Sequence, residues 1–140
     1  MNNQPTNITK VVVGVLYNNQ NQILIAKRPL HKPYGGLWEF PGGKIEPNES
    51  PVVALHRELL EELQINLEGK FVFLRPFHEI AYAYQPTQHI HLMIFKITEF
   101  TGEPIGAEGQ EIKWVHPRHL IHYNFPAANQ EIVQLLIKSS

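Results

Sequence analysis

The chain has 140 residues, 43% of them hydrophobic, which suffices for one domain with its own core and leaves no room for a second, so we expect residues 1–140 to form a single domain. Twelve basic and thirteen acidic residues give a formal charge of −1, which argues against a protein that coats a nucleic-acid polymer. Cysteine is absent, which excludes disulfides and thiolate metal sites.

The amino terminus shows no recognisable targeting signal. Residues 1–8 are polar and lack the basic and then apolar pattern of a signal peptide, so we expect a flexible start there. No apolar run approaches the roughly 20 residues of a membrane span. The sequence therefore predicts no membrane partner, and a cytoplasmic location follows by default.

The chain before residue 50 predicts a hairpin and then a loop. Residues 10–17 are rich in β-branched side chains and predict a buried strand, which the turn residues 18–21 should connect to a partner strand over 22–27. Residues 28–36 predict a loop that opens onto a short extended segment ending at Gly42 and Gly43. Two consecutive glycines allow a ligand close to the backbone and leave carbonyl oxygens for a metal, and an ordinary turn is the alternative.

Residues from Ser50 onward predict a helix. Asn48 or Ser50 can cap it, and Pro51 suits its first position. An apolar stripe at helical spacing marks its buried face, formed by Val52, Leu55, Leu59 and Leu63.

The rest of the chain predicts three strands and a closing helix. We expect strands over 70–76, 89–97 and 111–115, with a polar and aromatic connection over 81–88, a loop over 101–110, an irregular stretch over 117–124 and a helix over 126–137. Strands and helices mixed without regular alternation favour an α+β fold, with a mixed β-sheet and helices packed on its faces.

Three carboxylates lie close together on the predicted helix. Glu58 and Glu62 are four residues apart and so neighbours, while Glu61 lies further round. Helix stability does not favour them, because each like-charge pair costs on the order of 0.3 kcal/mol. Clustered oxygen ligands suit Mg²⁺, or Mn²⁺, which retains waters and bridges carboxylates to substrate phosphates. A solvated helix face is the alternative.

These carboxylates belong to a longer pattern that resembles the Nudix box: Gly, five residues, Glu, seven residues, Arg-Glu, an aliphatic residue, any residue, Glu-Glu, any residue, Gly and an aliphatic residue. The matching residues are Gly43, Glu49, Arg57, Glu58, Leu59, Glu61, Glu62 and Ile65. Gln64 stands where the family has its second glycine. Either the helix ends differently here, or Gln64 carries a left-handed strain on the order of 1 kcal/mol.

The likeness covers roughly residues 10–137 and is nearest to MutT-type enzymes, which remove 8-oxo-dGTP from the nucleotide pool. It implies a Nudix-type α/β/α sandwich, in agreement with the predicted elements. The metal shell that it implies consists of Glu58, Glu61, Glu62, Glu108 and the carbonyl oxygen of Gly42. Arg57 should orient the carboxylates, with Glu61 and Glu49 as its candidate partners.

The resemblance also implies how the substrate is bound. Asn129 is similar to the side chain that reads the guanine edge, Phe40 should contribute backbone contacts, and Arg28 is placed to meet the nucleotide. Gly42, Gly43 and Lys44 complete the expected substrate-binding set. One departure is Gln88, a neutral amide near the position where the bacterial enzyme has an arginine that contributes to nucleotide binding.

Several of these residues have a simpler interpretation. Asn129 could cap the closing helix, since asparagine is a favoured cap. Glu108 and Arg28 could be solvated loop residues. His89 and His91 share one strand face and fit a polar rim better than a zinc or copper site.

The expected function is Mg²⁺-dependent hydrolysis of a nucleoside triphosphate, 8-oxo-dGTP by the resemblance, to the monophosphate and pyrophosphate, with Glu58 or Glu108 as the general base. We expect a monomer with a small nucleotide as its partner. A related hydrolase for another dNTP, a sugar nucleotide or a dinucleotide is the first alternative. The second is a non-catalytic nucleotide-binding module, whose expected mark is loss of the carboxylates that this chain retains.

Overall fold

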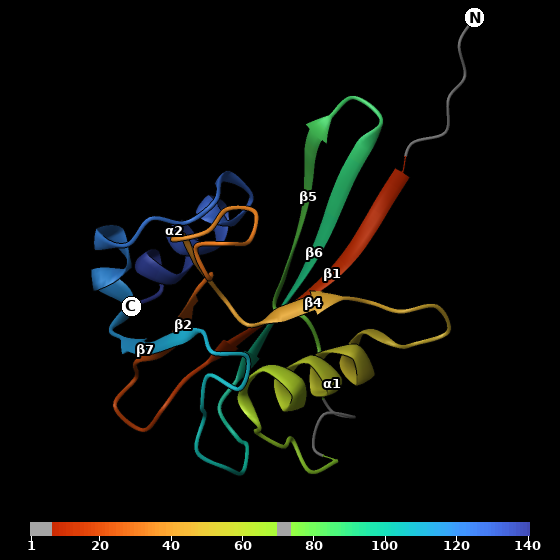
Figure 1. Cartoon of the computed structure of the whole chain (residues 1–140). Coiled ribbons are helices and arrows are strands. Elements are labelled where there is room, and N and C mark those ends of the chain that lie inside the picture. The colour runs from red at the N-terminus through yellow and green to blue at the C-terminus, as the bar shows by residue number, and fades with distance from the viewer. Residues whose placement is uncertain (1–6, 70–73) are drawn as a thin grey trace, which may run out of the picture.

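The larger of two β-sheets is mixed. In the computed structural model, which describes residues 7–69 and 74–140, strands β1 (Asn7–Leu16), β4 (Gly42–Lys44), β5 (His78–Gln85) and β6 (Gln88–Ile97) lie in the order β4-β1-β6-β5 (Figure 1). β1 runs parallel to β6 along its full length, whereas β4 and β5 are antiparallel to their neighbours. The predicted mixed sheet is therefore confirmed, with β6 in its interior.

A smaller antiparallel sheet joins segments from both halves of the chain. It consists of β3 (Trp38–Glu39), β2 (Ile23–Lys27) and β7 (Glu111–Val115), in that order. The described helices are α1 (Pro51–Leu63), α2 (Gln130–Lys138) and the short 3₁₀ helices η2 (Pro117–His122) and η3 (Ala127–Asn129). No helix within these described ranges is both long enough and apolar enough to cross a bilayer.

The two α-helices cover opposite faces of the sheets. Val12 and Leu16 of β1 pack in the same cluster as Leu55 of α1, whereas Val13 and Val15 pack in the cluster that contains α2. Because successive strand residues point to opposite faces, α1 and α2 must lie on opposite sides, as Figure 1 shows. The structure thus confirms the predicted α/β/α sandwich.

The predicted hairpin between residues 10–17 and 22–27 is wrong. The two segments meet across the turn only at an isolated bridge between Tyr17 and Ile23, beside a hydrogen bond of 3.1 Å from Asn18 N to Gln22 O. β6 pairs with β1 along its whole length, and β4 pairs with the other edge of β1 at residues 11–13. β2 therefore pairs with β3 and β7 instead.

The predicted connection over 81–88 is also wrong, because β5 occupies most of it and forms a hairpin with β6. Ile80, Tyr82 and Tyr84 alternate with other residues, which is the spacing of a strand. The predicted strand over 70–76 lies partly outside the described residues, and residues 74–76 belong to no strand. Asn7 and Ile8, predicted as part of a flexible start, already pair with β6.

Candidate active site

Helix α1, which carries the carboxylates of the Nudix-box pattern, begins and ends through specific local contacts. The Ser50 hydroxyl accepts a hydrogen bond from Val53 N at 3.3 Å, and Pro51 follows as its first residue. At the other end, Gln64 adopts φ 57° and ψ 35° and donates its N–H to Leu60 O at 3.0 Å. The helix thus ends as a glycine would end it, and Gln64 carries a strain of about 1 kcal/mol.

Arg57 organises the carboxylates at the entrance of α1. Its guanidinium donates two hydrogen bonds to Glu49, of 2.7 and 2.9 Å, and a third to Glu58 Oε1 at 2.8 Å. A fourth hydrogen bond, of 3.1 Å, goes to the carbonyl oxygen of Lys44 in β4. The bidentate pair lowers the pKa of Glu49 to about 2, chiefly through hydrogen bonding from Arg57. Glu61 lies 3.6 Å from Arg57, but its side chain is 58% exposed.

Glycines let β4 approach both α1 and β1. A Cβ on Gly43 would lie 2.5 Å from the carboxyl carbon of Glu58, and a Cβ on Gly42 would lie 2.0 Å from the carbonyl oxygen of Val12. Any larger residue would therefore displace Glu58 or separate β4 from β1. The two glycines are required by packing, and they place the backbone of β4 directly against the carboxylates.

Glu62 is held in place by the same strand and by the loop before β7. Its carboxylate accepts a hydrogen bond of 3.0 Å from Gly42 N, and its carbonyl oxygen accepts one from Gln110 Nε2 at 3.0 Å. Burial raises the pKa of Glu62 to about 8, with repulsion from Glu58, Glu39 and Glu108 adding to the shift. Burial also raises the pKa of Glu58, against the opposing effect of Arg57. Without a cation, this corner of the molecule disfavours its own negative charges.

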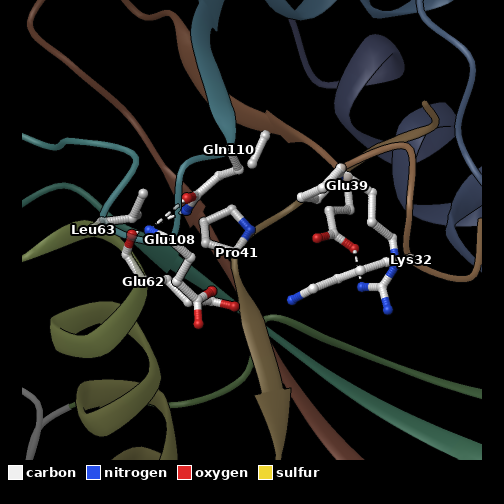
Figure 2. Close-up of a pocket in the computed structure, with 10 residues that line it drawn as sticks. Lys32, Glu39, Pro41, Glu62, Leu63, Glu108 and Gln110 are labelled. Carbon is white, nitrogen blue, oxygen red and sulfur yellow. Dashed lines mark hydrogen bonds and ion pairs between the residues drawn. The ribbon is translucent and has the colours of Figure 1, made fainter. Parts of the chain in front are cut away.

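A cavity of about 160 Å³ lies beside Glu62, between the loop over 28–36 and the loop before β7 (Figure 2). Its polar lining consists of Arg28, Lys32, Glu39, Glu62, Glu108 and Gln110. Arg28 and Glu39 form an ion pair at 3.3 Å. The structure therefore brings Arg28 and Glu108, which are 80 positions apart in the chain, into one cavity.

Lys32, Glu39 and Gln110 were not predicted as part of the site. Glu39 is in a two-residue strand, and the other two are in loops, where no periodicity marks the direction of a side chain. A carboxylate directly before Phe40 and a basic residue in a loop near two glycines were the only local signals. Neither separates a site residue from a solvated one.

The donor chemistry of the site fits a hard divalent cation. The carboxylates of Glu58 and Glu62 both lie against the Gly42–Gly43 backbone, and burial raises the pKa of each, which a bound cation would counteract. Within residues 7–69 and 74–140, however, no three side chains of His, Asp or Glu converge as a closed metal cage. Glu108 lines the cavity on the same side as Glu62 (Figure 2), whereas the Glu61 side chain is exposed.

Phe40 and Asn129 are the residues predicted to bind the base. Phe40 is 7% exposed and stacks on Phe125 at 5.0 Å between ring centroids. Asn129 ends η3 directly before α2, and its side chain makes no capping hydrogen bond. Asn129 therefore occupies the N-cap position of α2 that the capping interpretation gives it, but its side chain does not cap the helix. The polar-rim interpretation agrees with His91, whose Nε2 lies 3.0 Å from Glu79 Oε1.

Known proteins share the fold of this chain and about a third of its sequence. A NUDIX domain model matches residues 8–136. The chain is 35% identical over 127 residues to an 8-oxo-dGTP diphosphatase of Escherichia coli K12, covering 91% of this chain and 95% of that enzyme. It is 34% identical over 124 residues to a CTP pyrophosphohydrolase of the same organism, covering 88% and 87%. A solved MutT structure, from work on the Aliivibrio salmonicida and Vibrio cholerae proteins, has a TM-score of 0.81 at 36% identity and covers 96% of this chain and 100% of its own.

An α/β/α sandwich whose carboxylate-bearing helix packs against a Gly-Gly strand suits a hydrolase that works with a divalent metal, and a solved MutT structure shares this fold. The match over residues 8–136 then specifies which one: the chain belongs to the Nudix family and is a Nudix hydrolase.

Proposed function

We propose that the protein is a Mg²⁺-dependent nucleoside triphosphate diphosphatase that hydrolyses 8-oxo-dGTP to 8-oxo-dGMP and pyrophosphate. The observation that carries this is the placement of Glu58 and Glu62 against Gly42 and Gly43, in a chain that aligns with 95% of an enzyme named 8-oxo-dGTP diphosphatase. Removal of the oxidised nucleotide would prevent its incorporation into DNA. The function therefore implies the cytoplasm, and we propose a monomer.

The chain's own residues have distinct parts in this reaction. Glu58 and Glu62, with Glu61, Glu108 and the Gly42 carbonyl oxygen, would hold the metal. When bound, Mg²⁺ neutralises phosphate charge and acidifies water. Arg57 fixes the carboxylate of Glu58 through the 2.8 Å hydrogen bond and is itself fixed by Glu49. Glu58 or Glu108 accepts the proton from the attacking water.

Base recognition is assigned to Asn129 and the backbone of Phe40. The Asn129 amide offers both a donor and an acceptor, and no capping contact occupies it. Phe40 is rigid because it stacks on Phe125. Arg28, Gly43 and Lys44 contact the rest of the nucleotide in this proposal.

The alternative substrate with a specific observation behind it is CTP. The relative named CTP pyrophosphohydrolase is 34% identical, almost as similar as the 8-oxo-dGTP diphosphatase at 35%. The box residues recognise a diphosphate linkage and do not distinguish the two bases. The residues that contact the base must therefore determine which nucleotide is hydrolysed, and Asn129 is the first candidate among them.

The metal-site assignment is tested by Glu58→Gln and Glu62→Gln, each assayed for Mg²⁺-dependent pyrophosphate release. We expect each variant to lose about 100-fold or more in kcat while its circular dichroism spectrum stays unchanged. Glu103→Gln, which changes an exposed loop carboxylate away from the cavity, is the matched control and should retain activity. Full activity in both site variants would refute the assignment.

A further inference from the structure

The cavity wall opposite Glu62 and Glu108 carries a second basic residue, Lys32. Figure 2 shows its side chain extending into the space that faces these two carboxylates. It comes from the loop between β2 and β3, which is separate in sequence from the box. The cavity thus has an acidic side and a basic side.

Backbone hydrogen bonds fix the position of Lys32 within its loop. Lys32 N donates to Pro29 O at 3.1 Å, and Lys32 O accepts from Gly35 N at 2.9 Å. The loop is closed at its base by a hydrogen bond of 2.8 Å from Gly36 N to Arg28 O. It is also tight, because a Cβ on Gly35 would lie 2.5 Å from Leu30 O. The Lys32 backbone is therefore held in a compact turn that directs its side chain toward the cavity.

Lys32 is also the lining cation that remains available to an anionic ligand. Arg28 is committed to Glu39 at 3.3 Å and to the carbonyl oxygen of Pro33 at 2.5 Å. In the described parts of the chain Lys32 makes no ion-pair contact with a carboxylate, although its charge acts on Glu39 from a greater distance. Since Arg28 and Glu39 offset each other, the remaining lining charges are the Lys32 ammonium and the carboxylates of Glu62 and Glu108. Without Lys32 and without a metal ion, the net charge of this lining would be negative and would repel a phosphate.

We propose that Lys32 binds the phosphate chain of the substrate, so that the polyphosphate is contacted from two sides of the cavity. The carboxylate side acts through its divalent cation, and the loop side acts directly through the ammonium group. A flexible lysine suits this task because it is a compact point charge that can follow a phosphate oxygen. This inference rests on the proposed function for its substrate class, and it makes Lys32 a determinant of polyphosphate affinity that is indifferent to the base.

The test is a calorimetric titration of pyrophosphate, in the presence of Mg²⁺, into the full-length protein. We expect Lys32→Gln to weaken binding about tenfold and Lys32→Arg to restore most of the affinity. The matched control is Lys138→Gln, which changes a lysine in the last turn of α2, outside the cavity. It should bind like the wild type. Equal affinity of the wild type and Lys32→Gln, or no binding to the wild type, would overturn the inference.

A purely structural role for Lys32 gives a different result. In that case Lys32→Gln would lower the melting temperature, and Lys32→Arg would not restore pyrophosphate binding. We expect instead an unchanged melting temperature, and a KM that rises by the same factor for 8-oxo-dGTP and dGTP. A change in the ratio of the two KM values would overturn the claim that Lys32 contacts phosphate.

The inference and the proposed function can fail separately. If 8-oxo-dGTP is not hydrolysed but pyrophosphate binding still depends on Lys32, the substrate assignment falls and the phosphate contact stands. If 8-oxo-dGTP is hydrolysed and pyrophosphate binds equally to the wild type and to Lys32→Gln, the phosphate contact of Lys32 falls and the substrate assignment stands.

Discussion

In the proposed function Glu62 is under two opposing physical demands, because a metal ligand must be ionised and a buried carboxylate resists ionisation. The folded state raises the pKa of Glu62 from 4.5 to about 8, mainly through burial. A raised pKa means that the folded state binds the proton more tightly than the unfolded state does. The metal-free protein therefore loses stability as the pH rises from about 4.5 to about 8.

Glu62→Gln should remove this loss. The amide oxygen can still accept the hydrogen bond from Gly42 N, and no charge is buried. In EDTA at pH 8, we expect the variant to be more stable than the wild type by about 1 kcal/mol or more. At pH 4 the two should be similar. Urea denaturation at both pH values measures the difference in the free energy of unfolding. A variant no more stable than the wild type at pH 8 would contradict the destabilisation assigned to the ionised Glu62.

Asn129 carries the discrimination between bases in the proposed function. Asn129→Ala should lower kcat/KM for 8-oxo-dGTP by about tenfold or more, because an amide that pairs with the base is lost. The effect on dGTP should be smaller. The assay is pyrophosphate release from each nucleotide at low, equal concentration.

A neighbouring substitution controls for damage to α2. Gln134→Ala changes an exposed position of the same helix and should leave the selectivity unchanged. An equal loss for both nucleotides in Asn129→Ala would indicate that Asn129 does not read the base.

At the level of elements, α1 shows a conflict between sequence and backbone at Gln64. A glycine there would adopt φ 57° without strain, at the cost of a more flexible unfolded chain. We expect Gln64→Gly to raise the free energy of unfolding by about 0.5 kcal/mol. Chemical denaturation checks this value.

The matched control is Gln134→Gly, in the middle of α2, where the backbone is ordinary right-handed helix. It should destabilise the protein by about 1 kcal/mol. Equal destabilisation by both substitutions would show that Gln64 is not strained.

α1 was predictable because its signals are local. The Ser50 cap, Pro51 and the buried side chains Leu55, Leu59 and Leu63 follow directly from spacing within one segment. Strand pairing was less predictable, because it depends on which edges are free. The turn over 18–21 predicted a hairpin, but β1 already pairs along its whole length with β6, which is some eighty residues away.

In the whole molecule, the site exists because the two sheets bring distant segments together. The box carboxylates were predicted from their types and offsets, whereas Lys32, Glu39 and Gln110 were not. The cavity forms where the loop over 28–36 faces the end of α1 and the loop before β7 (Figure 2). No pattern within either loop specifies that contact. The roles of Asn129 and Phe40 were inferred from the family resemblance. The structure adds that the Asn129 side chain makes no capping hydrogen bond to α2.

The most direct test of the account is Mg²⁺-dependent hydrolysis of 8-oxo-dGTP, compared with dGTP and CTP at low, equal concentrations with the products identified. The account predicts a large preference for 8-oxo-dGTP, with 8-oxo-dGMP and pyrophosphate as products. Equal or weaker activity on 8-oxo-dGTP would contradict the substrate assignment and leave a Nudix hydrolase that acts on another nucleotide.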